Sequence, residues 1–292
     1  MSPGVFDRPV MIVSAPRAGS TLLYETLAHA RGLWTIGGES HAVIESFPEL
    51  RPEARGYDSH RLDAADATAE RTRALRERFL AELRDRDGRR WRELPPDGRP
   101  EQVRFLEKTP RNSLRVSFLD AVFPDARFVF LHRDPRENVA SIIEAWRAPG
   151  FWQWRGDLPG WDREEWCMLL PPGWRSLVGR PLEEIAAHQW RASVQTALDD
   201  LAALPPERWM PLDFGDLVAN ATRAVRRVCA FAEIEVDDRL ARVLERSLAP
   251  SSSVVTPPNP EKWRKNAAAI DSVLPSLEPV ARRLGELVES RA

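Results

Sequence analysis

Apolar residues along the chain follow two alternating patterns. Four short runs, at residues 10–15, 103–106, 127–131 and 209–214, are largely continuous and rich in β-branched and aromatic side chains. Such runs are typical of strands that are buried on both faces of a parallel sheet. A segment with apolar residues at helical spacing follows each run. The alternation predicts an α/β fold in three layers, a mostly parallel central sheet with helices on both faces.

Two of the predicted helices carry clear start signals. The first helix is expected to begin with Ser20 as its N-cap, because a hydroxyl there accepts a hydrogen bond from the first turn. Leu22, Leu23 and Leu27 then lie on one side of that helix. Pro135 follows the third apolar run and suits a first-turn position, where its missing N–H is not needed. Strand–turn–helix units therefore recur along the chain.

Residues 45–100 differ from the rest of the chain in their pattern of charged and apolar residues. Leu75, Phe79 and Leu83 recur every four positions among many charged residues, which predicts an amphipathic helix on the domain surface. The arginines there would suit a nucleic acid, but acidic residues interleave throughout and argue against such a partner. We interpret the region as a helical insertion within one domain that spans residues 1–292.

Tryptophan is concentrated in one part of the chain. Seven of the eleven tryptophans lie between Trp146 and Trp190, and residues 148–180 are also rich in proline and glycine. We interpret residues 148–180 as an ordered loop or lid over an acceptor, because aromatic walls orient sugars, phenols and alkyl chains alike. Ordinary core packing explains the same tryptophans equally well, so both interpretations stand at this point.

Composition limits the classes of function. The 292 residues include 42 basic and 44 acidic side chains, a formal charge of −2 that provides no overall field for nucleic acid or an anionic membrane. The chain has two cysteines, Cys167 and Cys229, which lie far apart in the sequence. They do not form the pattern of a disulfide-stabilised domain, and so few cysteines fit a reducing compartment. No apolar run approaches a membrane span and the first residues lack signal-peptide features, so a cytoplasmic location is expected. The oligomeric state is left open.

The turn after the first apolar run has the chemistry of an anion site. A turn between a buried strand and a helix directs several backbone N–H groups into one small volume, where the helix dipole adds positive charge. Gly19 leaves room for a ligand, and Arg17 supplies a fixed charge with planar donor geometry. The turn is not a Walker A loop, because Ser20 follows Gly19 where that motif has lysine. A tight turn with a surface arginine is the alternative.

The same turn resembles the 5'-phosphosulfate loop of sulfotransferases that use 3'-phosphoadenosine 5'-phosphosulfate (PAPS). The matching residues are Pro16-Arg17-Ala18-Gly19-Ser20-Thr21-Leu22-Leu23, with Ala18 in place of the usual serine. Arginine rather than lysine in the loop is nearer to tyrosylprotein, glycan and bacterial carbohydrate sulfotransferases than to the cytosolic phenol type. The resemblance implies a P-loop NTPase-like sulfotransferase fold, and a nucleotide site formed by Arg17, Ala18, Gly19, Ser20, Thr21 and Leu22.

The resemblance also implies two further contacts with the nucleotide. The family's 3'-phosphate signature, an arginine and a serine eight positions later, matches Arg133 and Ser141. A late basic loop of the family corresponds to Arg264 and Lys265, with Asn266 where glycine is usual. Ligands of open α/β sheets bind at the carboxyl edge, where these elements are expected to meet. Ion pairing of Arg133 with Asp134 or Glu137, and a solvated basic turn at 264–265, are the alternatives.

The resemblance further implies the catalytic residues. Sulfuryl transfer is close to phosphoryl transfer, so positive charge must stabilise the leaving phosphate, which suits Arg17. Lys108 matches the lysine that reaches the sulfuryl group in the Glu-Lys-Thr-Pro segment of glycan sulfotransferases. Glu39, twenty-two residues beyond Arg17, is the expected general base, with a pKa raised by burial. His41 is the rival base, since its ordinary pKa is already suitable.

Rival functions make different demands on the site. A P-loop kinase or nucleotide hydrolase needs the Walker lysine and a magnesium-binding carboxylate, and neither is evident. A catalytically inactive nucleotide-binding module would have lost Glu39 or Lys108, and both are present. The histidines show no ligand-like spacing, so no metal is expected. With these rivals set aside, the resemblance implies PAPS as the co-substrate, adenosine 3',5'-bisphosphate (PAP) as the product, and a small-molecule or carbohydrate acceptor with a hydroxyl or an amine.

Overall fold

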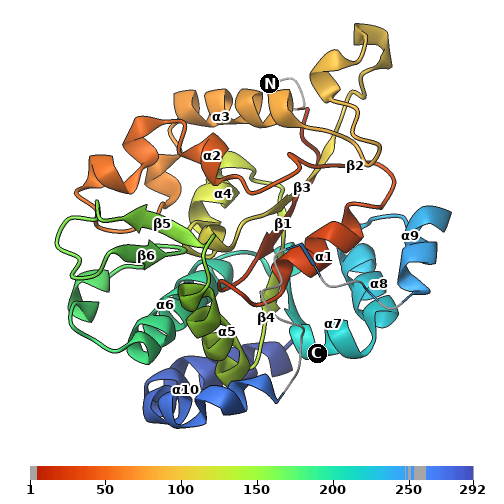
Figure 1. The fold of residues 1–292 in the computed structure, drawn as a ribbon. Helices are drawn as coiled ribbons and strands as arrows, with labels where there is room; N and C mark the ends of the chain where they lie inside the picture. The colour runs from red at the N-terminus through yellow and green to blue at the C-terminus, as the bar shows by residue number, and fades with distance from the viewer. Residues whose placement is uncertain (1–4, 247, 249–250, 253–260, 292) are drawn as a thin grey trace.

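A five-stranded parallel sheet forms the centre of the computed structural model, which describes residues 5–246, 248, 251–252 and 261–291 (Figure 1). The strand order is β2-β3-β1-β4-β7, and every neighbouring pair is parallel. Four of the strands were expected from the apolar runs, and β2 was not, because two residues leave no pattern to read. The strands are β1 (Val10–Val13), β2 (Leu33–Trp34), β3 (Arg104–Lys108), β4 (Arg127–His132) and β7 (Trp209–Asp213).

Each face of the sheet packs against its own group of helices, so the three-layer prediction is confirmed. Alternate strand residues point to opposite faces. Val10, Ile12 and Leu131 belong to one core, which α1 (Ser20–Leu27), α8 (Ala221–Ala232) and α9 (Asp238–Leu244) cover. Met11 and Phe130 belong to the other core, on the side of α3 (Ala69–Glu82), α4 (Val116–Val122), α5 (Pro135–Arg147), α6 (Leu182–Ala202) and α10 (Ala267–Glu289).

Shorter elements connect these layers. Two short helices follow strand ends near the cavity described below, α2 (His41–Ile44) and α7 (Phe214–Ala219). The 3-10 turns are η1 (Pro48–Leu50), η2 (Pro52–Arg55), η3 (Ala64–Asp66), η4 (Trp91–Glu93), η5 (Pro96–Gly98), η6 (Pro110–Leu114), η7 (Trp174–Leu177), η8 (Pro206–Arg208) and η9 (Lys262–Asn266). Several of them begin with proline, whose fixed φ suits a first helical turn.

The amphipathic helix expected between residues 45 and 100 is α3. Leu75 and Phe79 on its inner side are fully buried against the core, while the charged residues of the helix face outward. Leu83 is buried too, but it lies just after the helix end in extended conformation. The four-residue spacing therefore predicted the helix correctly, and the last residue of the pattern is its C-cap.

The tryptophan-rich segment forms a small core of its own. Strands β5 (Trp152–Arg155) and β6 (Glu165–Cys167) pair as an antiparallel hairpin beside the main sheet (Figure 1). Trp161 and Trp166 meet edge to face with ring centroids 4.7 Å apart, and Trp174 packs on Trp166. Trp154 is buried in the same cluster. Core packing is therefore the main role of these side chains.

Three observations concern chemistry elsewhere in the described residues. Cys167 and Cys229 are both buried as free thiols, and burial raises the pKa of Cys229 to about 11. Over the ranges the structure describes, no group of three or more His, Cys, Asp or Glu side chains is placed to hold a metal ion. Among the same residues, no helix has the length and apolar character needed to cross a membrane.

Candidate active site

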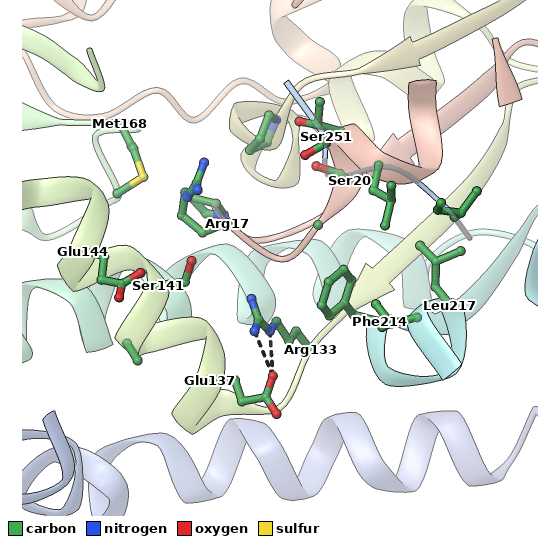
Figure 2. A pocket seen from close by; sticks show the side chains of 18 of the residues that line it. Arg17, Ser20, Arg133, Glu137, Ser141, Glu144, Met168, Phe214, Leu217 and Ser251 are labelled. Atoms are coloured by element: carbon green, nitrogen blue, oxygen red, sulfur yellow. Dashed lines mark hydrogen bonds and ion pairs between the residues drawn. The ribbon is translucent and has the colours of Figure 1, made fainter. Parts of the chain in front are cut away.

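A cavity of about 870 Å³ lies at the carboxyl edge of the sheet. Part of its lining comes from the segments after four strand ends: Arg17 after β1, Pro110 after β3, Arg133 after β4 and Phe214 after β7. Parallel strands end at one edge, so turns that are far apart in the sequence meet there. Figure 2 shows Arg17, Arg133 and Phe214 around one common space.

The turn after β1 exposes the start of α1. Arg17 and Gly19 both have left-handed backbone conformations, with φ of 65° and 102°. Gly19, not Ser20, is the N-cap, and no side chain of the described residues caps this helix end. Ser20 is the first helical residue and lines the cavity with Thr21. The N–H of Leu22 donates to the carbonyl oxygen of Gly19 at 3.0 Å, so the N–H groups of Ser20 and Thr21 are the ones left for an anion.

Phe214 fixes the shape of this turn. A Cβ atom added at Gly19 would lie 2.2 Å from the Phe214 ring, so no larger residue fits there without movement. The guanidinium of Arg133 lies over the other side of the site, 4.7 Å from the centroid of the same ring. Phe214 thus packs between the two predicted anion-binding elements. Sequence reasoning did not single out this residue, because its role depends on packing between separate turns.

Arg17 points into the cavity with unused hydrogen-bonding capacity. Its Nε is buried and has no hydrogen-bond partner among the described residues. The guanidinium stacks over Phe151 at 4.6 Å from the ring centroid. Burial, and then the positive charge of Arg133, lowers the pKa of Arg17. An anion bound between the two arginines would offset both effects.

Asn138 holds the turn from the opposite side. Its side-chain amide donates to the carbonyl oxygen of Pro16 at 2.7 Å, and the residue is fully buried on α5. The bond fixes the residue just before the left-handed Arg17. Nothing in the local sequence around Asn138 indicated this contact, which spans more than one hundred residues.

Arg133 and Ser141 lie on the same side of the cavity as predicted by their spacing. Asp134 caps α5 by accepting from the backbone of Arg136 and Glu137, which places Arg133 just before the helix. Arg133 donates from Nε and Nη2 to Glu137 at 3.0 and 2.8 Å, so the ion-pair alternative also holds (Figure 2). Ser141 lines the cavity two turns further along α5. The structure brings Arg17, Arg133 and Ser141 to one cavity.

The C-terminal basic residues differ from the expectation. Arg264 and Lys265 do not line the cavity, whereas Lys262 and Trp263 do. Arg264 is exposed and pairs with Glu261 at 2.5 Å. Lys262 pairs with Glu144 of α5, also at 2.5 Å. The sequence indicated the basic cluster, but it did not indicate which side of the η9 turn faces the cavity. The first residues of the expected loop, 257–260, lie outside the described residues.

Ala18 lies outside the cavity as well. Its side chain is fully buried beneath the turn, and its N–H donates to the carbonyl oxygen of Ala15 at 3.3 Å. Gly19, Ser20, Thr21 and Leu22 of the same predicted loop all line the cavity.

Glu39, Lys108 and His41 form a charged group at the other end of the cavity. Lys108, at the end of β3, donates to Oε1 of Glu39 at 2.8 Å, and Nδ1 of His41 lies 3.6 Å from Oε2. Burial favours a raised pKa for Glu39, but His41 and Lys108 outweigh it and lower the pKa to about 2. The expectation of a raised pKa was therefore wrong, because a hydrogen bond from His41 and the positive charge of Lys108 act on this carboxylate. Glu39 and His41 line the cavity, and Lys108 contacts it through Glu39.

The hairpin and η6 complete this end. Of the seven clustered tryptophans, Trp152 alone lines the cavity, beside Phe151 and Gln153. Arg111 of η6 lines it too, and its guanidinium contacts Glu45 and Gln153. The end therefore combines an aromatic wall with a fixed positive charge.

Comparison with known proteins decides the family. The family model described as "Sulfotransferase family" matches residues 9–238. The chain is a member of the sulfotransferase family. The protein-tyrosine sulfotransferase A of Caenorhabditis elegans is 25% identical to this sulfotransferase over 94% of the chain, which spans 66% of that relative's length. The crystal structure of the sulfotransferase STF9 from Mycobacterium avium shares the fold, with a TM-score of 0.54 and 18% identity over 97% of this chain and 77% of that one.

Proposed function

We propose that this sulfotransferase transfers the sulfuryl group of PAPS to a hydroxyl or an amine of a small-molecule or carbohydrate acceptor. The observation that carries the proposal is the single cavity that Arg17, Arg133 and Ser141 share with Glu39. Two groups for binding anions and one carboxylate then face the same ligand space. A nucleotide phosphorylated at both ends matches the first two, and a proton acceptor matches the third.

The residues present fit such a nucleotide. The helix start after Gly19 has no side-chain cap and no acidic residue in its first turn, and Arg17 has an unpartnered buried nitrogen. These groups suit the 5'-phosphosulfate. Arg133 and Ser141 suit the 3'-phosphate, and Lys262 replaces Arg264 and Lys265 as the C-terminal cation at the cavity. When the phosphate arrives, it competes with Glu137 for Arg133 and with Glu144 for Lys262.

The side chains divide the chemistry between them. PAPS supplies an activated sulfuryl group whose leaving oxygen belongs to a phosphate. Arg17 and the N–H groups of the α1 start stabilise negative charge on that phosphate. Lys108 does not line the cavity and acts on the reaction through its ion pair with Glu39. Glu39 accepts the proton of the acceptor. Its pKa of about 2 keeps the carboxylate ionised but also makes it a weak base, so its assignment rests on position and not on basicity.

The choice of Glu39 over His41 as the base rests on contacts. Lys108 Nζ holds Glu39 at 2.8 Å. The His41 side chain is more exposed, and its Nδ1 lies 3.6 Å from the Glu39 carboxylate. A base must be held within reach of the proton that it removes. The better-held group is therefore assigned the role.

The acceptor would lie against the end lined by Phe151, Trp152 and Arg111. Aromatic side chains there suit the body of a sugar, a phenol or an alkyl alcohol. The name of the nematode relative points to tyrosine side chains as acceptors for that protein. A tyrosine-containing peptide therefore belongs in any acceptor panel beside sugars, phenols and amines.

Two measurements test the proposal. A thermal-shift comparison should show stronger stabilisation by PAP than by ATP with magnesium, and the reverse order would favour a kinase or hydrolase. Labelled PAPS, incubated with the acceptor panel, should yield PAP and a labelled product. Binding of PAP without turnover of PAPS in any condition would instead indicate an inactive nucleotide-binding module.

A further inference from the structure

We propose that Thr109 and Glu107 form a buried positioning relay that fixes the base Glu39 through the backbone of Ser40. The inference rests on the proposed function, since it assigns a purpose to residues behind the same catalytic group. Thr109 and Glu107 do not line the cavity. They are accordingly positioning residues and not catalytic ones.

The relay is a continuous chain of hydrogen bonds. The N–H of Ser40, the residue directly after Glu39, donates to Oγ1 of Thr109 at 2.7 Å. The Thr109 hydroxyl donates in turn to Oε1 of Glu107 at 2.6 Å. With its proton committed to Glu107, the hydroxyl presents a lone pair to Ser40. The carboxyl of Glu107 therefore sets the polarity of the bond that holds the backbone beside the base.

A second connection fixes the same point. Asn112 of η6 donates from its side-chain amide to Oγ of Ser40 at 3.0 Å, and that oxygen lies 3.1 Å from the Thr109 hydroxyl. Ser40 is thus held through both its backbone and its side chain. Since Ser40 is the N-cap of α2, the relay sets where this helix starts and where Glu39 enters the cavity.

Burial makes the network specific. Ser40, Thr109 and Asn112 are fully buried, and Glu107 is 1% exposed. A polar group in such surroundings is costly unless it is paired, so the arrangement has few alternatives. Oε2 of Glu107 has no hydrogen-bond partner among the described residues. Burial raises the pKa of Glu107, which favours a neutral carboxyl that a glutamine side chain can imitate.

The neighbouring strand residue explains why the relay matters. Lys108 lies between Glu107 and Thr109 in sequence and pairs with Glu39. Three consecutive residues of β3 and its end therefore act on the base: Lys108 on its carboxylate, and the other two on its backbone. Because a displacement of about 1 Å can lower a rate about 100-fold, a loosened Ser40 should reduce turnover without affecting the nucleotide end.

Thr109→Val tests the relay, because valine keeps the shape and removes the hydroxyl. With labelled PAPS and the panel acceptor that turns over fastest, or water if none does, kcat should fall about 10- to 100-fold. The Kd for PAP should stay within about twofold of the wild-type value, since the Arg17 turn is untouched. Thr109→Ser should restore most of kcat, and Glu107→Gln should keep it within about threefold while Glu107→Leu does not.

Thr26→Val is the matched control. Thr26 is also buried and donates from its hydroxyl at 2.8 Å, but to the carbonyl oxygen of Leu22 within α1. It should leave kcat near the wild-type value. A Thr109→Val variant with unchanged kcat, or one that loses PAP affinity in parallel with kcat, would overturn the relay.

A readout without turnover separates this inference from the proposed function. Carbon-13 NMR of the Glu39 carboxyl should show a pKa near 2 in the wild type, and a value closer to 4.5 once Thr109→Val moves the carboxylate away from its cations. An unchanged pKa would count against the relay even if the protein transfers sulfuryl groups. Wild-type protein that never turns over PAPS would refute the proposed function, whatever the NMR result.

Discussion

The two ends of the cavity are built in different ways. The nucleotide end, formed by Arg17, Arg133 and Ser141, comes from the adjacent strands β1 and β4 and the helices that follow them. The acceptor end, formed by Glu39, His41, Arg111 and Trp152, comes from three separate segments joined by side-chain contacts. The sheet thus determines the first end, whereas ion pairs and hydrogen bonds determine the second. Under the proposed function, substitutions at the acceptor end should therefore change acceptor choice and leave the nucleotide end as it is.

Removing the base should have the largest effect and should act on one end only. Glu39→Gln is expected to lower kcat by about 10²- to 10⁴-fold, because no carboxylate is left to take the proton from the acceptor substrate. The Kd for PAP, measured by calorimetry, should remain within about twofold. His41→Gln serves as the paired variant. If it abolishes transfer while Glu39→Gln does not, His41 is the base.

The nucleotide end should respond in the opposite way. Arg17→Ala and Arg133→Ala should each weaken PAP binding about 10- to 100-fold, as expected for losing a hydrogen-bonded charge. Arg264→Ala is the control, because this exposed residue does not line the cavity. Equal losses for Arg264→Ala and Arg133→Ala in calorimetry would return the C-terminal contact to Arg264.

Gly19 and Gly32 both have a positive φ, and substituting each with alanine separates the cost of steric crowding from the cost of a left-handed backbone. Gly19→Ala must accommodate the Phe214 ring as well as a φ of 102°, whereas Gly32→Ala has a φ of 79° and open space. The free energy of unfolding in urea should fall by about 1–2 kcal/mol for Gly32→Ala, the cost of a left-handed residue. It should fall about 1–3 kcal/mol further for Gly19→Ala because of overpacking. Equal losses would mean that Phe214 moves aside at no cost.

Two tryptophans separate acceptor binding from stability. Trp152→Ala should raise the KM for the acceptor about threefold to tenfold and leave PAP binding unchanged, since its ring is 38% exposed at the cavity. Trp166→Ala should instead lower the free energy of unfolding by about 3–5 kcal/mol, because this ring is fully buried. A Trp152 variant with normal acceptor KM would exclude the residue from the acceptor wall.

The smallest expected effect is an absence of change with pH. Because the pKa of Glu39 is about 2, the carboxylate stays ionised as the pH falls from 8 to 4, and its protonation should remove no activity in that range. Lys108→Met deletes the ammonium group that lies 2.8 Å from Glu39, raises the pKa of Glu39 and should bring an acid limb into the measured profile. An identical profile in both proteins would mean that Lys108 does not control the base.

The sequence was informative where the relevant contacts are local. Four of the strands and the Arg17 turn follow from short apolar runs and the residues next to them, since strand burial and turn chemistry are local properties. Arg133 and Ser141, which the family resemblance singled out, share a cavity with that turn because β4 is paired with β1 and α5 begins directly after β4. The two-residue strand β2 escaped notice, since it is too short to leave a pattern.

Contacts between distant segments were not predictable in this way. Phe214 and Asn138 act through packing and one hydrogen bond across the fold, and their own neighbours in sequence give no signal. The pKa of Glu39 was expected to rise with burial and instead falls, because Lys108 and His41 approach it in space. Lys262 lines the cavity where Arg264 was expected, for a related reason. Which side chain of a short turn faces a cavity depends on the segments that the turn packs against, and these are distant in sequence.

The pairing of β1 with β4 has a consequence for ligand length. Val13 and Phe130 are partners in register, and each lies a few residues before the arginine of its turn. Neighbouring strands are about 4.8 Å apart, so the backbone fixes the interval between the strand ends from which the two arginine-bearing turns start. Under the proposed function, this interval sets a base length for the bisphosphate, and the path of the turns and the reach of the two arginine side chains add to it.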